Sequence, residues 1–321
     1  MKKGLVFLCA IFFSLSVIFI IYFKLNNNII DKQKVKKTEE NIIENKSNMT
    51  IRVKISKTGE IIAMDINDYL KGVVPSEMPP SYNIEALKAQ AVVARTYTFR
   101  KMQDNAEVGA DICDDFNHCQ VYNSKEKLIS IWKKKGYSDD LIDEYINKIN
   151  IAVSSTSEVI KYNGEYIKAF FHASSPIKTE DVSEIWGRSS LPYLVSVDNV
   201  EDESYINRYS CVSLSLNDIS NKINVQNITK VNINSYTASG RVKDVLFNNT
   251  LISAEKLRIL FGLKSTFFTI DVKDNIITFN VTGYGHGVGM SQVGANYLAN
   301  KNYNYIDIIK YYYKNVSIEN M

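Results

Sequence analysis

The chain has 321 residues and a formal net charge of +3, with 38 Lys and Arg against 35 Asp and Glu. This near balance, with lysines scattered along the chain, argues against a nucleic-acid-binding protein, whose basic residues gather on one face. The length is sufficient for one large or two modest domains with a buried core. Composition therefore predicts a mildly basic globular protein over most of the chain.

The N-terminus differs from the rest. Residues 4–23 form an apolar run broken only by two serines and preceded by two lysines. About 20 apolar residues is the length that a membrane-spanning helix requires. Because no small-residue cleavage motif follows, we expect residues 1–23 to be an uncleaved anchor of a single-pass cell-membrane protein. The short N-terminal tail favours an inside N-terminus and an outer domain at residues 51–321, joined by a flexible Asn-, Lys- and Glu-rich linker at residues 24–50.

The outer domain opens with a predicted hairpin over residues 51–64 and a short helix from Ile66. Proline disfavours the helical conformation in the preceding residue, so this helix is expected to end by Pro75. Glu77 then lies in a constrained turn among apolar residues, and such surroundings raise the pKa of a carboxyl. Glu77 is therefore a candidate general acid, and the alternative is a helix-capping or salt-bridged glutamate.

The clearest predicted helix covers residues 83–102, with Asn83 as its cap and alanines that allow close packing. Arg95 on this helix either reaches into a site or is a buried ion-pair partner. Further on, residues 124–150 carry two helical patterns. A hairpin with an Asn163-Gly164 turn follows at residues 159–172 and leads into a polar loop, where functional side chains commonly lie.

Two cysteines and a histidine lie within seven residues, at Cys113, His118 and Cys119. Thiolate and imidazole are ligands of tetrahedral zinc, so this cluster predicts a small structural zinc site. Glu107, Asp111 or water would supply the fourth ligand. The alternative is a local disulfide between the two cysteines, which an extracytoplasmic location permits.

The remaining pattern alternates strands and helices. Strands are predicted at residues 194–197, 212–216, 231–236, 242–247, 267–272 and 276–281. Helices are predicted at residues 216–222 and 253–261, and two more between residues 291 and 314. Strands mostly in hairpins with helices between them predict a single α+β outer domain of antiparallel hairpins.

Residues 283–292 contain four glycines within seven residues, and His286 lies among them. Glycines this dense indicate a backbone that turns sharply or lets another group approach closely. The loop feeds a predicted helix, whose free N–H groups suit an oxygen-rich ligand. Neither a Walker motif nor a dinucleotide fingerprint is present. The alternative is a structural turn with a core histidine.

Five blocks together resemble the stage II sporulation protein D family, and they follow the family's order: residues 69–79, 85–97, 186–187, 260–267 and 283–292. The resemblance implies a peptidoglycan lytic transglycosylase of forespore engulfment, with Glu77 as the catalytic acid and base. It also implies glycan strands stripped of stem peptides as substrate. The implied partners are the sporulation amidase, stage II sporulation protein P, and the membrane protein known as stage II sporulation protein M.

A lytic transglycosylase needs only one carboxylate, because the C6 hydroxyl of N-acetylmuramic acid is the nucleophile, whereas ordinary hydrolases use two. We expect the substrate to be held on one wall by His286, Gly287, Gly289, Ser291 and Gln292. The other wall is expected to hold Arg95, Gln120, His172, Ser174, Ser175 and Thr179. Pro176 and Ile177 stand where the family usually has two glycines, which stiffens this loop.

Two other functions fit the same sequence. Relatives of this family include non-catalytic proteins that bind glycan and stimulate an amidase. A zinc amidase built on the cysteine and histidine cluster fits less well, because two thiolates make zinc a poor Lewis acid. Among these alternatives, the carboxylate at Glu77 favours the transglycosylase.

Overall fold

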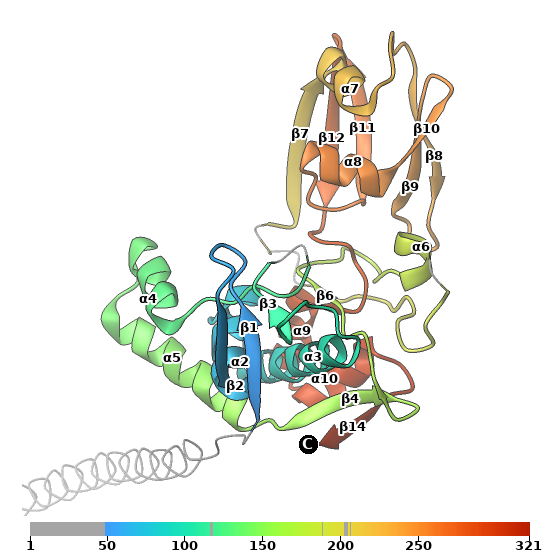
Figure 1. Cartoon of the computed structure of the whole chain (residues 1–321). Helices are drawn as coiled ribbons and strands as arrows, with labels where there is room; N and C mark the ends of the chain where they lie inside the picture. The colour runs from blue at the N-terminus through green and yellow to red at the C-terminus, as the bar shows by residue number, and fades with distance from the viewer. Residues whose placement is uncertain (1–48, 116–117, 188, 202–204, 206) are drawn as a thin grey trace, which may run out of the picture. The chain divides into compact units, whose positions relative to one another are not determined.

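The computed structural model describes residues 49–115, 118–187, 189–201, 205 and 207–321 (Figure 1). The predicted anchor at residues 1–23 and nearly all of the linker therefore lie outside the described residues. Within the described ranges, no helix is both long and apolar enough to cross a bilayer. The first strand, β1 (Thr50–Lys54), begins one residue before the predicted start of the outer domain.

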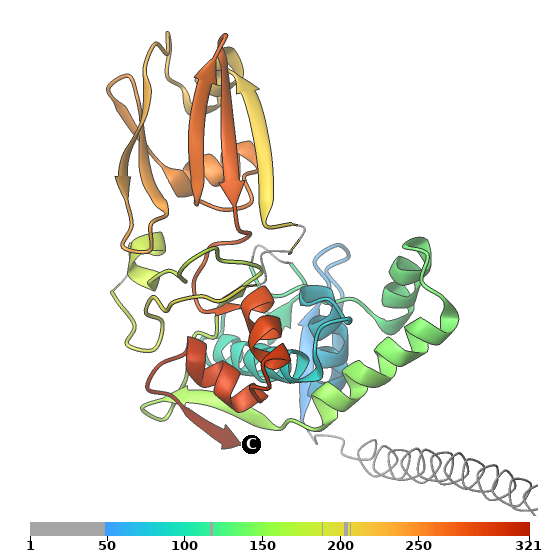
Figure 2. The same cartoon turned by 180° about the vertical axis from the view of Figure 1, so that it is seen from behind.

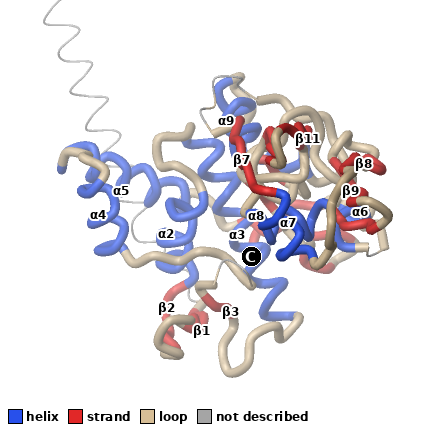
Figure 3. The backbone as a smooth tube through the Cα atoms, turned by 90° about the horizontal axis from the view of Figure 1, so that it is seen from above, coloured by secondary structure: helices blue, strands red, loops and turns tan. Residues whose placement is uncertain are grey.

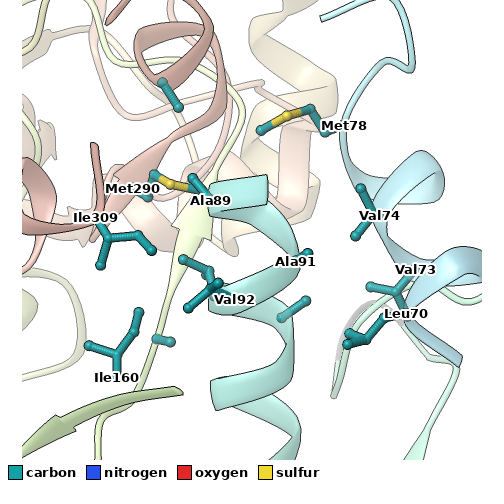
Figure 4. Packing of buried hydrophobic residues seen from close by; sticks show 14 of the residues in the cluster. Leu70, Val73, Val74, Met78, Ala89, Ala91, Val92, Ile160, Met290 and Ile309 are labelled. Atoms are coloured by element: carbon teal, nitrogen blue, oxygen red, sulfur yellow. The ribbon is translucent and has the colours of Figure 1, made fainter. Parts of the chain in front are cut away.

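The main hydrophobic core is built around α2 (Ile66–Glu77) and α3 (Ile84–Gln103), with buried residues from the elements that surround them. Leu70, Val73 and Val74 of α2 point toward the alanine-rich face of α3 (Figure 4). The predicted cap is confirmed, because the Asn83 side chain accepts a hydrogen bond of 3.0 Å from the backbone of Glu85. Small side chains let these two helices pack closely, which fixes the position of the end of α2.

Proline does not end α2 where the sequence predicts. Pro75 lies inside the helix, which continues to Glu77. Proline lacks the N–H that would donate to the carbonyl four residues earlier, but the hydrogen bonds of the residues after it continue the helix. The Ser76 hydroxyl donates to the Gly72 carbonyl at 2.6 Å, and the Met78 N–H donates to the Val74 carbonyl at 2.9 Å. Glu77 is thus the last residue of the helix and does not lie in the constrained turn that the sequence predicts.

Short sheets and further helices surround this helix pair. The predicted first hairpin is confirmed as β1 and β2 (Ile61–Asp65), and β3 (Ile112–Cys113) pairs parallel with β1. Figure 3 shows α4 (Lys125–Lys134) and α5 (Asp139–Ser154) beside α2. The remaining elements around the core are β4 (Glu158–Tyr162), β5 (Glu165–Tyr166), α9 (Gln292–Asn300), α10 (Tyr305–Tyr312) and β14 (Ser317–Asn320).

A second hydrophobic core forms within residues 209–282, which we call the inserted lobe. Its ends meet where the Gly283 N–H donates to the Arg208 carbonyl at 2.7 Å. Figure 2 shows its strands β7, β12 and β11 side by side. Its elements are β7 (Tyr209–Ser215), α7 (Leu216–Ile223), β8 (Val231–Tyr236), β9 (Val242–Phe247), β10 (Thr250–Ser253), α8 (Ala254–Phe261), β11 (Phe268–Lys273) and β12 (Ile276–Thr282).

The α+β class with antiparallel hairpins is confirmed, but two strand predictions are wrong. Residues 194–197 form no strand, because they pack as an irregular segment against the loop before α6 (Val182–Trp186). The second strand of the 159–172 hairpin breaks after Tyr166, and its far end becomes β6 (Phe171–His172). This end pairs parallel with β13 (Met290–Ser291), a long-range partner that local alternation does not reveal.

Candidate functional site

Glu77, at the end of α2, turns its side chain toward the segment after the two cysteines. Its Oε1 accepts a hydrogen bond of 2.7 Å from the backbone N–H of Val121. Burial raises the pKa of Glu77 to about 7, and the Val121 hydrogen bond, which favours the ionised form, opposes this only in part. No charged group among the described residues contributes to the shift. A half-buried carboxyl that is partly protonated near neutral pH is suited to donate a proton.

Two tyrosines lie within electrostatic reach of Glu77. Burial is the main cause that raises the pKa values of Tyr69 and Tyr97, and the negative charge of Glu77 adds to both shifts. Tyr69 is fully buried and stacks on Tyr122 with ring centroids 5.5 Å apart, whereas Tyr97 is half-buried. Tyr97 is therefore the member of this pair that reaches the surface near Glu77.

The segment that holds Glu77 is itself tied to α3 by Gln120. Its Nε2 donates to the Thr98 hydroxyl at 3.0 Å and to the Ala94 carbonyl at 3.3 Å. Gln120 is 1% exposed, so in this structure it positions the backbone beside Glu77. It does not face solvent as the prediction of substrate contact requires.

The predicted metal ligands do come together, and Glu107 joins them. Each of Glu107, Cys113, His118 and Cys119 offers one ligand atom, and these atoms all lie within 4.8 Å of one another. His118 Nδ1 lies 3.4 Å from each sulfur and 3.2 Å from Glu107 Oε2. Tetrahedral zinc with bonds of about 2.0–2.3 Å separates its ligands by about 3.5 Å, so the donor set and spacing fit zinc.

The structure also bears on the fourth ligand of this cluster and on the alternative of a disulfide. Both candidate carboxylates are ion-paired, Asp111 with Arg52 at 2.9 Å and Glu107 Oε1 with Lys54 at 2.8 Å. Only Glu107 lies within the cluster, where its Oε2 is 3.2 Å from His118 Nδ1. Cys113 and Cys119 are free thiols in the structure, without the disulfide that the sequence also allows. The cluster lies next to Gln120 and Val121, so whatever holds it together also fixes the segment that contacts Glu77.

The glycine loop at residues 283–292 packs against a buried carboxylate that sequence reasoning missed. The Glu201 side chain is fully buried and accepts hydrogen bonds from three of the predicted substrate-binding residues. These donors are the Ser174 hydroxyl at 2.5 Å, the Ser175 N–H at 2.6 Å and the Ser291 hydroxyl at 2.7 Å. Asn199 adds a fourth bond at 2.7 Å. Glu201 thus joins the loop after β6 to the start of α9.

A second buried network involves His172. Its Nδ1 donates to the Val288 carbonyl at 3.2 Å, which leaves Nε2 to accept from the Ser175 hydroxyl at 2.6 Å. Arg241 of the inserted lobe donates to the same hydroxyl at 2.7 Å. Burial, and then the neighbouring His286 and Arg241, hold the pKa of His172 well below its ordinary value. His172 is therefore a neutral structural residue in this network.

Glu180 contacts both the glycine loop and the inserted lobe. Its backbone N–H donates to the Gly287 carbonyl at 2.8 Å, and its side chain accepts from the Thr237 and Ser239 hydroxyls. Thr179 beside it accepts a hydrogen bond of 2.9 Å from the Val197 N–H. The side chain of Glu180 thus bonds the inserted lobe to the main core, while its backbone bonds to the glycine loop.

Most residues predicted to contact substrate are therefore buried and bonded within the protein. Arg95 is fully buried, with its guanidinium donating to the Thr156 and Glu158 carbonyls at 2.7 and 3.2 Å. Gln292 is 6% exposed and donates to Gln90 at 3.3 Å. The structure gives a supporting position, in place of the predicted substrate contact, to Arg95, Gln120, His172, Ser174, Ser175, Thr179, Ser291 and Gln292.

The glycines of the loop are explained by close packing. All four have positive φ, between +74° and +105°. A Cβ on Gly287 would lie 2.6 Å from the Arg241 guanidinium, and one on Gly289 would overlap the Phe170 carbonyl oxygen. His286 remains half-buried between these glycines, and burial lowers its pKa to about 3. The loop is thus a packed structural turn that leaves the His286 ring partly exposed.

A cavity of about 460 Å³ lies beside α2, between that helix and the α4–α5 pair. Gly72 and Pro75 line it from α2, and Tyr122 and Trp132 line it from the other side. Glu77 is not among its lining residues, although Tyr122 directly follows Val121. The cavity is therefore a neighbour of the candidate acid and not the site that contains it.

Fold and site together define an α+β protein with a candidate acid–base glutamate. The family model described as stage II sporulation protein matches residues 54–162. The chain is 34% identical over 260 residues to stage II sporulation protein D of Bacillus subtilis, across 79% of this chain and 74% of that protein. The Bacillus amyloliquefaciens protein of the same name gives the same figures. The chain belongs to the stage II sporulation protein D family, which places it among sporulation proteins.

A more distant relative carries a different name. The Bacillus subtilis protein called amidase enhancer is 28% identical over 307 residues, across 78% of this chain and 40% of that protein. Its name links that protein to an amidase. The comparison assigns no reaction to this chain.

Proposed function

We propose that this chain is a lytic transglycosylase that cleaves the bond between N-acetylmuramic acid and N-acetylglucosamine in peptide-free glycan strands. The observation that carries the proposal is Glu77, a half-buried carboxyl whose pKa is raised to about 7. In its neutral form it donates a proton to the glycosidic oxygen as that bond breaks. The resulting carboxylate then takes the proton of the C6 hydroxyl, whose oxygen bonds to C1 and closes the 1,6-anhydro ring.

The raised pKa of Glu77 predicts a pH dependence. The carboxyl must be protonated to begin the reaction, so kcat/KM should fall as pH rises through about 7. His172 and His286 would not produce this transition, because their lowered pKa values keep both neutral through this range. The measurement is cleavage of peptide-free strands between pH 5 and 9, with the melting temperature followed in parallel. A flat profile in a folded protein would argue against Glu77 as the acid.

The direct test is mass spectrometry of peptide-free glycan strands incubated with the purified outer domain. Anhydro-ended fragments support the transglycosylase, whereas free reducing ends indicate a hydrolase. Absence of cleavage would favour the second candidate, a non-catalytic protein that binds glycan and stimulates an amidase. The relative named amidase enhancer supports that second candidate. Adding a purified amidase to the same strands distinguishes stimulation from inactivity.

In this proposal the outer domain acts at the membrane surface during forespore engulfment. Residues 1–23 would anchor it, residues 24–50 would tether it, and the domain would lie outside the engulfing mother-cell membrane. Its partners would be glycan strands, the amidase stage II sporulation protein P and the membrane protein stage II sporulation protein M. Co-purification of the full chain with each protein, compared with a chain that starts at residue 47, tests the partners and the anchor.

We further propose that Glu107, Cys113, His118 and Cys119 hold a structural zinc ion. The ion would supply no chemistry to the cleavage step. These residues would instead lock the segment whose Val121 N–H bonds to Glu77.

Removing this ion should therefore destabilise the domain. We expect chelation, or Cys119→Ser, to lower the melting temperature by roughly 5–10 °C, since structural zinc contributes folding free energy directly. Cys211→Ser is the matched control, because Cys211 is an exposed cysteine on β7 away from the cluster. Metal analysis of the purified protein reports occupancy. A chain that carries no zinc and melts unchanged with chelator would refute the site.

A further inference from the structure

Four aromatic rings form a continuous row on the main core, and no predicted role explains them as a set. Tyr97 of α3 contacts Phe170 with ring centroids 6.5 Å apart, and Phe170 contacts Trp186 at 4.9 Å. Trp186 in turn lies 5.2 Å from the His286 ring, which also lies 6.2 Å from Phe170, so these three rings together form one end of the row. We call these four residues the ring row. They come from α3, the segment before β6, the end of α6 and the glycine loop, so only the folded chain brings them together.

Trp186 is the exposed member of the row. It is 38% exposed, whereas the other three are half-buried. Tryptophan is usually largely buried, and one held in place at the surface is typical of a binding residue. Phe170 and His286 contact its ring in tilted arrangements, with interplanar angles of 54° and 52°, and these contacts hold the indole in position.

The short helix that carries Trp186 is fixed at both ends. Asp181 caps its start by accepting from the Ser183 N–H at 2.8 Å, and Gly187 closes its end in the left-handed conformation, donating to the Ser183 carbonyl at 3.1 Å. Glu184 pairs with Lys243 of the inserted lobe at 2.9 Å. Glu180, which bonds to the glycine loop, precedes this helix. The indole is thus positioned by the same contacts that hold the two cores together.

At its other end the ring row approaches the candidate acid. The Tyr97 hydroxyl donates to the His118 carbonyl at 3.3 Å, beside the segment that bonds to Glu77. The row therefore leads from the surface at Trp186 toward the point where a glycosidic bond would be cleaved.

We propose that Trp186 is an outer stacking platform for the glycan, binding one pyranose ring of the strand whose scissile bond lies at Glu77. This inference rests on the proposed function. The flat apolar face of a pyranose fits an indole, and its hydroxyls suit the polar groups around α6, including the Glu184 and Lys243 pair. A protein partner would need a wider apolar patch than one tryptophan at the edge of half-buried rings.

The chain contains two tryptophans, which makes a direct test feasible. Trp132 lies on α4, is 4% exposed and lines the cavity beside α2. In a Trp132→Phe protein, fluorescence reports Trp186 alone, and in a Trp186→Phe protein it reports Trp132 alone. With Glu77→Gln added to prevent cleavage, saturating peptide-free glycan strands should protect Trp186 from most acrylamide quenching. Trp132 should show no change.

Kinetics supply a second test that does not depend on the Trp132 substitution. Trp186→Ala should raise KM for peptide-free strands about tenfold with a smaller change in kcat, as expected for loss of a tryptophan contact, and Trp186→Phe should lie between. Tyr236→Ala is the matched control, because Tyr236 is an exposed aromatic residue on the inserted lobe, at 59%. It should leave both constants unchanged.

The outcomes separate this inference from the function on which it rests. Strands that are cleaved while Trp186 stays unprotected, with an unchanged KM in Trp186→Ala, would overturn the platform and leave the transglycosylase intact. Protection of Trp186 without any cleavage by the unsubstituted chain would support the platform and reject the transglycosylase. A response from Trp132 alone would move the subsite to the cavity beside α2 and overturn the proposal.

Discussion

Glu77→Gln is expected to reduce formation of anhydro-ended fragments by about 1,000-fold or more, the scale for losing a positioned acid and base. The amide keeps the size of the side chain and can still accept the 2.7 Å hydrogen bond from Val121. It cannot donate a proton to the leaving oxygen or accept one from the C6 hydroxyl. Mass spectrometry of the products measures the loss, with Glu60→Gln, at an exposed glutamate, as the control.

The same variant should not lose stability. Because the pKa of Glu77 is raised from an ordinary value of 4.5 to about 7, the folded state binds its proton more tightly than the unfolded state does. Stability from this group is therefore lost as pH rises through that window. Replacing Glu77 with a neutral side chain removes the loss, so at pH 8 Glu77→Gln should be more stable by about 1–2 kcal/mol.

These two expectations fix how the result is interpreted. An inactive variant that melts at or above the temperature of the unsubstituted chain locates the defect in chemistry and not in folding. Unchanged anhydro-product formation would exclude Glu77 as the acid. An unsubstituted chain that cleaves nothing would direct attention to the amidase-stimulating alternative, for which a glycan-binding assay is the next measurement.

Local sequence was enough to predict that the Glu77 carboxyl has a raised pKa and that the candidate metal ligands lie together. Glu77 stands in an apolar stretch, and its raised pKa follows from that burial. Cys113, His118 and Cys119 lie within seven residues, so folding could scarcely separate them. Hairpins and caps such as Asn83 were predictable for the same reason, since their contacts span a few residues.

The buried networks could not be predicted in the same way. Glu201 lies in an acidic run that is typical of a solvated surface, yet the fold encloses it among the hydroxyls of Ser174 and Ser291. Arg241 reaches Ser175 across 66 residues of sequence. The sequence predicts substrate contacts for these serines because it displays their polar character and does not reveal their buried partners. The sequence held one indication of this network. Ser291 belongs to the glycine loop, and Glu201 is an acid without a predicted role, so a buried hydrogen-bond network that joins them was a reasonable alternative.

The second large effect is expected in the glycine loop. Gly289→Ala should lower the free energy of unfolding of the domain by at least about 3 kcal/mol. Gly289 has φ +74°, where an L-residue is strained, and its Cβ would overlap the Phe170 carbonyl oxygen. That oxygen cannot move freely, because it accepts from the Met290 N–H at 3.1 Å and from the Tyr313 hydroxyl at 2.7 Å. Thermal and denaturant unfolding measure the loss.

Gly164→Ala is the control that separates the cost of a positive φ from the cost of the steric overlap with Phe170. Gly164 has φ +81°, similar to Gly289, but no other atom lies within 4 Å of its Cβ position. It should therefore cost only about 1 kcal/mol, the penalty of the left-handed conformation. Equal effects at the two positions would mean that the loop is not constrained by packing. A larger effect at Gly289 would support a loop that fixes Phe170, and through it the Trp186 ring 4.9 Å away.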